Sequence, residues 1–179
     1  MKRFYPILVL SIILLTSCKK DKNVSDDAPP PDTPPAIDQR DKFVGTWEGR
    51  FYLEIPNVPP NSPLENLPDS VPTTLTITKS ANNAAEIQIV VNNTITGNRT
   101  TKAFVNANRY FYEPFNTKFF NIVDVSFRGD GLLGTDGTSI SEEGFLKTSA
   151  VNIPPLGPIP GINLPALIGV WSSKLKKKL

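Results

Sequence analysis

Residues 43–55 read FVGTWEGRFYLEI, and this stretch decides the fold class. From Phe43 to Ile55 every second residue is apolar or glycine, whereas the residues between them are mostly polar or charged. A period of two places one set of side chains on each face of an extended strand. The stretch therefore predicts a strand with one buried face, and we expect Trp47, which lies on that face, to be a core residue.

The same alternation recurs along the chain and predicts an all-β domain over residues 42–179. Tight-turn signals separate the alternating segments, and Asp136-Gly137 is the clearest of them. About eight antiparallel strands result, and eight strands close into a barrel that side chains fill or that holds one small ligand. We therefore expect an up-and-down β-barrel, with a β-sandwich as the alternative. The predicted strands after the first centre on residues 75–77, 87–91, 103–105, 110–112, 123–128, 139–148 and 166–176.

The N-terminus has the pattern of a targeting signal. Met1-Lys2-Arg3 is positively charged, and the largely apolar run over residues 4–15 is too short to span a membrane as a relaxed helix. The next residues, Leu15-Thr16-Ser17-Cys18, resemble the lipobox at which bacterial lipoproteins are cleaved and acylated. The resemblance implies a signal peptide over residues 1–17. It also implies that acyl chains on Cys18, palmitate among them, anchor the mature chain in a membrane.

Residues 18–41 are predicted to be the lipidated N-terminus and a proline-rich tether. Proline runs occupy residues 29–31 and 34–35, and no apolar pattern is present that would build a core, so we expect disorder. In bacterial lipoproteins an Asp directly after the acylated Cys retains the protein in the inner membrane, and here that position is Lys19. The resemblance therefore implies transfer to the outer membrane. It leaves open whether the periplasmic or the surface leaflet receives the protein.

The composition argues against several functions. The chain contains no His, which removes the usual general base and the commonest metal ligand, and Cys18 is its only Cys. It also has no Gly-x-Ser-x-Gly motif. Lys2 and Arg3 account for the whole net charge of +2, so the mature chain is neutral and gives no electrostatic reason to expect a nucleic-acid partner. We expect a non-enzymatic protein without a metal or cofactor.

The first strand resembles that of a known family. Residues 44–49, VGTWEG, are similar to the Gly-x-Trp strand of lipocalin-like domains, and residues 74–79, 105–108 and 171–177 also resemble small lipoprotein barrels of this type. Lipocalins place an Arg near the last strand against the tryptophan. No Arg follows Arg128 in this chain, so Lys174 or Lys176 is expected to substitute for it. The resemblance further implies a barrel that holds a small apolar ligand.

Two long loops rich in proline and apolar residues, 56–72 and 150–165, follow the first and seventh predicted strands. Alternate connections of an up-and-down barrel lie at the same end. Both loops should therefore lie opposite the tether, together with 92–98 and 114–118, whereas the turns 80–84, 106–108 and 134–137 lie at the other end. Barrel closure makes the two long loops neighbours, so we expect them to contact each other. They form either a lid or an exposed binding patch.

These observations predict a membrane-anchored lipoprotein of the cell envelope whose barrel binds a small apolar ligand or a protein partner. The alternative is a structural or surface-assembly protein with a filled barrel and no ligand. A sizeable cavity lined by aromatic side chains would favour the first function. The candidate ligand or rim contacts are Phe51, Leu64, Leu67, Tyr110, Tyr112, Leu156, Ile159 and Leu164.

Overall fold

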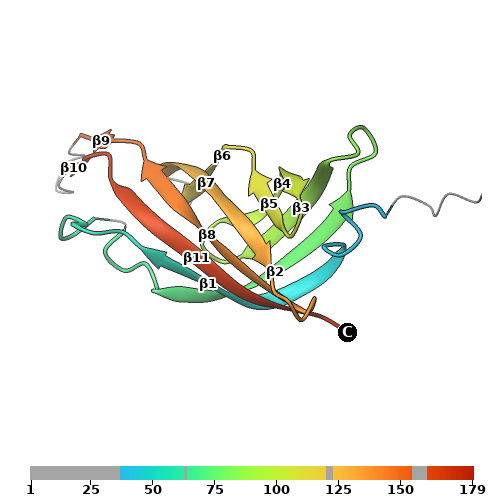
Figure 1. The fold of residues 1–179 in the computed structure, drawn as a ribbon. Helices are drawn as coiled ribbons and strands as arrows, with labels where there is room; N and C mark the ends of the chain where they lie inside the picture. Colours follow the sequence, from blue (N-terminus) through green and yellow to red (C-terminus); the bar gives the residue numbers. More distant parts are fainter. Residues whose placement is uncertain (1–36, 63, 120–122, 155–160) are drawn as a thin grey trace, which may run out of the picture. The chain divides into compact units, whose positions relative to one another are not determined.

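A computed structural model of the chain describes residues 37–62, 64–119, 123–154 and 161–179. The described residues are strands, turns and loops, and none of them belongs to a helix long and apolar enough to cross a membrane. The strands, labelled as in Figure 1, are β1 (Gly45–Glu54), β2 (Ser70–Lys79), β3 (Glu86–Asn93), β4 (Gly97–Asn106), β5 (Arg109–Tyr112), β6 (Phe115–Phe119), β7 (Val123–Leu133), β8 (Ser139–Thr148), β9 (Val151–Ile153), β10 (Ile162–Leu164) and β11 (Ile168–Lys177).

The strands close into one antiparallel barrel. Neighbouring strands follow the order β5-β4-β3-β2-β1-β11-β8-β7, and β5 also pairs with β7, so the sheet returns on itself. β5 pairs with residues 130–132 of β7 and β6 with residues 123–127, which makes β5 and β6 two halves of one strand interrupted at Pro114. The result is an eight-stranded barrel. It confirms the predicted fold class, and the β-sandwich alternative is wrong.

The turns 80–84, 106–108 and 134–137 lie at one end of the barrel and the two long connections at the other, as predicted (Figure 1). Two of the predicted loops are nevertheless wrong. Residues 115–118 of the predicted loop 114–118 belong to β6 (Phe115–Phe119). The predicted loop 92–98 shrinks to residues 94–96, because the Asn93 side chain accepts hydrogen bonds from the backbone of Ile95 and Thr96 and closes a tight turn. The long segment 150–165 also contains the β9–β10 hairpin.

Inward-facing side chains fill the tether end of the barrel around Trp47, which is fully buried as predicted. Its indole Nε1 donates a hydrogen bond of 2.8 Å to the Phe43 carbonyl, and Lys177 Nζ lies 5.3 Å from the centre of the ring. The prediction that Lys174 or Lys176 would provide this cation is wrong. The odd-numbered residues of β11 point inward, so Lys177 meets Trp47 while Lys174 and Lys176 are exposed.

Two inward-facing glycines bring the barrel wall close to Trp171. Gly129 of β7 and Gly144 of β8 lie directly opposite each other. A Cβ on Gly144 would lie 2.6 Å from Trp171 Nε1, and a Cβ on Gly129 would lie 2.5 Å from Trp171 Cζ2. The indole also donates a hydrogen bond of 3.2 Å to the Arg128 carbonyl. The absence of both side chains therefore lets the wall approach the indole at this point.

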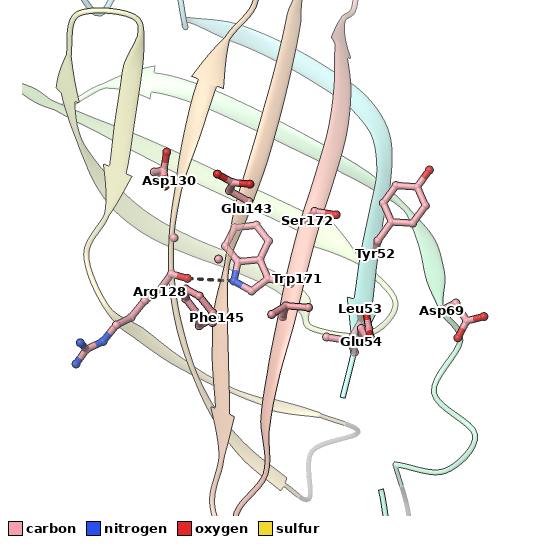
Figure 2. A pocket seen from close by; sticks show the side chains of 13 residues that line it. Tyr52, Leu53, Glu54, Asp69, Arg128, Asp130, Glu143, Phe145, Trp171 and Ser172 are labelled. Carbon is pink, nitrogen blue, oxygen red and sulfur yellow. Dashed lines mark hydrogen bonds between the residues drawn. The ribbon is translucent and has the colours of Figure 1, made fainter. Parts of the chain in front are cut away.

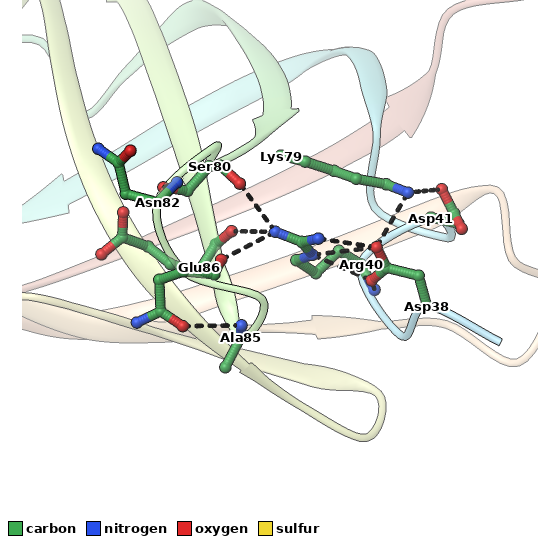
Figure 3. A network of polar contacts seen from close by, with 9 residues as sticks. Asp38, Arg40, Asp41, Lys79, Ser80, Asn82, Ala85 and Glu86 are labelled. Atoms are coloured by element: carbon green, nitrogen blue, oxygen red, sulfur yellow. Dashed lines mark hydrogen bonds and ion pairs between the residues drawn. The ribbon is translucent and has the colours of Figure 1, made fainter. Parts of the chain in front are cut away.

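The last residues of the predicted tether are part of the fold (Figure 3). Asp38 forms ion pairs with Arg40, at 2.8 Å, and with Lys79, at 3.0 Å, and Lys79 also pairs with Asp41 at 2.5 Å. The hydrogen bond from Arg40 holds the pKa of Asp38 well below its usual value. The Arg40 guanidinium also donates hydrogen bonds to the carbonyl oxygens of Ser80, Asn83 and Glu86. The predicted domain boundary after residue 41 is therefore too late. Charged groups make this contact, so the apolar pattern of the sequence could not reveal it.

Candidate functional site

A buried polar cluster occupies the middle of the barrel. Glu142 of β8 accepts hydrogen bonds from the hydroxyl groups of Tyr110, at 2.5 Å, and of Tyr112, and all three side chains are buried. The guanidinium of Arg99 extends inward from β4 and lies 4.6 Å from the ring centre of Phe115. Cation and aromatic ring attract each other in this geometry. The two tyrosines proposed as ligand contacts are therefore engaged by the protein itself.

Burial dominates the electrostatics of this cluster. Desolvation raises the pKa of Tyr110 and Tyr112 well above the usual range, and the neighbouring Glu142 carboxylate acts in the same direction. Burial also raises the pKa of Glu142, although hydrogen bonds from the two tyrosines oppose the shift. Desolvation lowers the pKa of Arg99 to about 10, which still leaves the guanidinium charged at neutral pH.

The space left inside the barrel is small. The cavity beside Glu142 and Arg99 has a volume of about 10 Å³, and its walls include Phe51, Tyr112 and Trp171. A polar cavity of this size holds about one water molecule. Arg99 Nε and Nη1 are buried and find no hydrogen-bond partner among the described residues, so such a water would satisfy them. A small apolar ligand does not fit in this space.

A large hollow lies on the outside of the barrel wall. It has a volume of about 810 Å³ and lies over β1, β11, β8 and β7 (Figure 2). Its floor includes Gly129 and Gly144, where the wall lies close to Trp171. We call it the outer-wall groove. Its lining comprises Tyr52, Leu53, Glu54, Asp69, Arg128, Gly129, Asp130, Glu143, Gly144, Phe145, Val170, Trp171 and Ser172.

Strand register arranges the outward side chains of the groove in two rows. One row runs across β7, β8, β11 and β1 as Arg128, Phe145, Val170 and Glu54. The other row runs across the same strands as Asp130, Glu143, Ser172 and Tyr52. Side chains directly opposite each other on neighbouring strands lie about 4.5–5.5 Å apart at Cβ. The groove therefore presents an apolar centre with charged groups close beside it.

Exposed apolar side chains lie at the centre of the groove. Phe145 is 67% exposed and Val170 is 43% exposed, and the two face each other directly on β8 and β11. Ile168, the next outward residue before Val170, is 65% exposed. Single exposed apolar residues are ordinary, whereas a contiguous group of them typically marks an interaction site. The arrangement is suited to non-covalent binding.

The residues predicted to contact a ligand or to form the rim lie in two places, the barrel interior and the end with the long loops. Phe51, Tyr110 and Tyr112 lie in the packed interior. At the loop end Leu64 and Leu164 are buried in the same core, and Leu67 packs partly buried against it. The buried leucines favour the lid over the exposed patch.

The predicted contact between loops 56–72 and 150–165 stays a prediction. The first loop begins after the end of β1, and the second ends at the start of β11. These two strand ends are adjacent, because Glu54 of β1 lies opposite Val170 of β11. Leu156 and Ile159, which were proposed as rim contacts within the second loop, lie outside the described residues.

The groove residues were not among the sequence candidates. The signal for them was apolar residues at outward positions, such as Phe145 between Glu143 and Lys147, or Val170 between two inward residues. A single apolar residue at an outward position of a strand is common and does not indicate a site. Only the register between β8 and β11, which sets Phe145 opposite Val170, brings them together.

Comparisons with known families and with curated proteins find no match for this chain. Among solved structures the chain is similar to a redesigned β-barrel, with 10% sequence identity and a TM-score of 0.42. The similarity covers 80% of this chain and 98% of the designed one. No functional conclusion follows from a likeness of this size.

Proposed function

We propose that this chain is a lipid-anchored, lipocalin-like protein of the outer membrane that binds a protein partner in its outer-wall groove without catalysing a reaction. The anchor rests on the lipobox resemblance of Leu15-Thr16-Ser17-Cys18 and on the proline-rich segment that follows. Two or three acyl chains hold a protein stably at a membrane. In this proposal the segment holds the barrel away from the bilayer, where a partner can reach the wall.

The observation that carries the binding proposal is the outer-wall groove with exposed Phe145 and Val170 as neighbours. Covering these side chains would remove apolar surface from water, which contributes about 25 cal/mol per Å². Among the residues that the structure describes, the interior leaves a cavity of about 10 Å³ beside Glu142, which is no comparable site. The same filled interior also favours the second candidate, a structural envelope protein without a ligand.

Site-specific cross-linking in intact cells separates the two candidates. A photoreactive phenylalanine analogue replaces Phe145 in the groove or, as a control, the exposed Thr100 on β4. A binding module gives a discrete adduct with a partner protein from position 145 and none from position 100. The absence of an adduct, or the same adduct from both positions, would favour the structural candidate.

The anchor has its own test. Cells that express the protein are grown with a labelled fatty acid, and the label is measured on the purified wild type and on Cys18→Ser. We expect label on the wild type alone, because the thiol of Cys18 is the proposed acylation site. Label on the variant would refute the lipid anchor and leave the groove unaffected.

A further inference from the structure

Two carboxylates lie directly opposite each other in the outer-wall groove. Asp130 of β7 and Glu143 of β8 are register partners, and both point outward. Like charges in this position destabilise a sheet. Arg109 neutralises one of them through a contact of 2.9 Å to Asp130. Glu143 is exposed and forms no ion pair within the part of the chain that the structure describes.

The unneutralised carboxylate is next to the exposed apolar residues. Phe145 follows Glu143 by two positions on the same face of β8, a separation of about 6.5–7 Å along a strand. Val170 lies directly opposite Phe145. A bound segment could therefore cover Phe145 and Val170 and reach Glu143 with a neighbouring side chain.

The remaining charges give the groove a negative balance. Glu54 and Asp69 add two further carboxylates, and Arg128 supplies the one guanidinium of the lining. Proteins pair surfaces of opposite potential at their interfaces, which raises association rates and selects partners. Within the lining, electrostatic complementarity therefore favours a positively charged occupant, and the cations Lys147 and Lys174 lie outside the lining, at its edges.

We propose that the outer-wall groove binds a partner segment that carries a basic side chain next to an apolar one. This inference rests on the proposed binding function. The basic group pairs with Glu143, and the apolar side chain packs on Phe145 and Val170. Local conflicts such as the opposed carboxylates are expected at functional sites. In this proposal the partner's basic group neutralises Glu143, as Arg109 already neutralises Asp130.

Binding of defined peptides to the purified protein tests this assignment. A labelled eight-residue peptide of alternating lysine and phenylalanine is compared with two analogues, one with glutamate for lysine and one with serine for phenylalanine. Fluorescence anisotropy should show the basic apolar peptide binding at least about tenfold more tightly than either analogue. High salt should weaken it, because ions screen an exposed pair.

Matched variants locate the contact. Glu143→Gln should weaken the basic apolar peptide about fivefold, whereas Glu113→Gln, the same loss of charge at an exposed site outside the groove, should leave its affinity unchanged. Equal effects of both variants would overturn the inference, because they would indicate general attraction to negative charge.

The peptide series also separates this inference from the proposed function. Equal affinity for the acidic and basic peptides would refute the basic partner, while an adduct from position 145 would still support binding in the groove. The binding function itself fails if Phe145→Ser changes the affinity of none of the peptides and position 145 gives no adduct. Phe145 is largely exposed, so this variant should keep the fold.

Discussion

Tyr110 donates a hydrogen bond of 2.5 Å to the Glu142 carboxylate in the middle of the barrel, where the sequence predicted aromatic walls of a ligand cavity. The same carboxylate also accepts a hydrogen bond from Tyr112. Buried polar groups that are fully satisfied stabilise one arrangement of a core, and partly satisfied ones are costly. The interior cluster is therefore expected to maintain the barrel, and binding is assigned to the outer wall.

Neutralising the interior carboxylate should destabilise the fold. Glu142→Gln removes the charged acceptor of two hydroxyl groups and leaves Arg99 without its counter-charge, so we expect a loss of about 1–3 kcal/mol in urea unfolding. Glu143→Gln, one residue further along β8 and facing outward, is the matched control and should change stability by less than about 0.5 kcal/mol. Equal losses in the two variants would contradict the filled, polar interior.

The tyrosines predict a loss of stability at alkaline pH. Burial raises the pKa of Tyr110 and Tyr112 in the folded state, so their contribution is fully present below pH 10, the ordinary tyrosine value. As the pH rises above 10 the unfolded chain releases these protons first, and each tyrosine removes about 1.4 kcal/mol of stability per pH unit until its folded pKa is reached. Urea unfolding between pH 9 and 11.5 measures the slope. Tyr112→Phe should give a shallower slope than the wild type, and an unchanged slope would refute the assignment.

The close approach of the barrel wall to Trp171 beneath the groove requires a glycine at position 144. Gly144→Ala would place its Cβ 2.0 Å from the Arg128 carbonyl oxygen and 2.6 Å from Trp171 Nε1. We expect a loss of about 1–3 kcal/mol, as for other overpacked cores, together with a change in tryptophan fluorescence. Ser141→Ala, on the outward face of the same strand, is the control and should affect neither quantity.

The Arg40 contacts predict where the chain can be shortened. Removal of residues 1–36 should leave the thermal unfolding midpoint unchanged, whereas removal of residues 1–41 should lower it by several degrees, because the ion pairs of Asp38 and Lys79 are lost with it. Arg40→Ala should reproduce part of this loss, and Gln39→Ala, at an exposed site, should not. Equal midpoints for the two truncations would show that the contacts of Asp38 and Arg40 contribute nothing to thermal stability.

The sequence predicts most of the barrel because its strands alternate and its turns are marked. β8 occupies residues 139–148, as predicted from the Asp136-Gly137 turn and the alternation that follows. β6 was missed because residues 114–118 were predicted to be a loop, although the chain resumes pairing with β7 directly after Pro114. The outer-wall groove could not be predicted. The predicted strand order already places β8 beside β11, but the groove also depends on the register that sets Phe145 opposite Val170 and on the approach of Trp171 to two glycines, and alternation along single strands reveals neither.

Methyl NMR tests most directly the claim that binding takes place in the outer-wall groove and not inside the barrel. Valine methyl groups report separately on the two sides of the wall. Val170 lines the groove and Val91 lines the interior cavity. The barrel is titrated with the basic apolar peptide and, separately, with dodecanoate as an apolar ligand. We predict that the peptide shifts the methyl signals of Val170 and that neither titrant shifts those of Val91. Shifts at Val91 with Val170 unchanged would place the binding site inside the barrel and contradict the account.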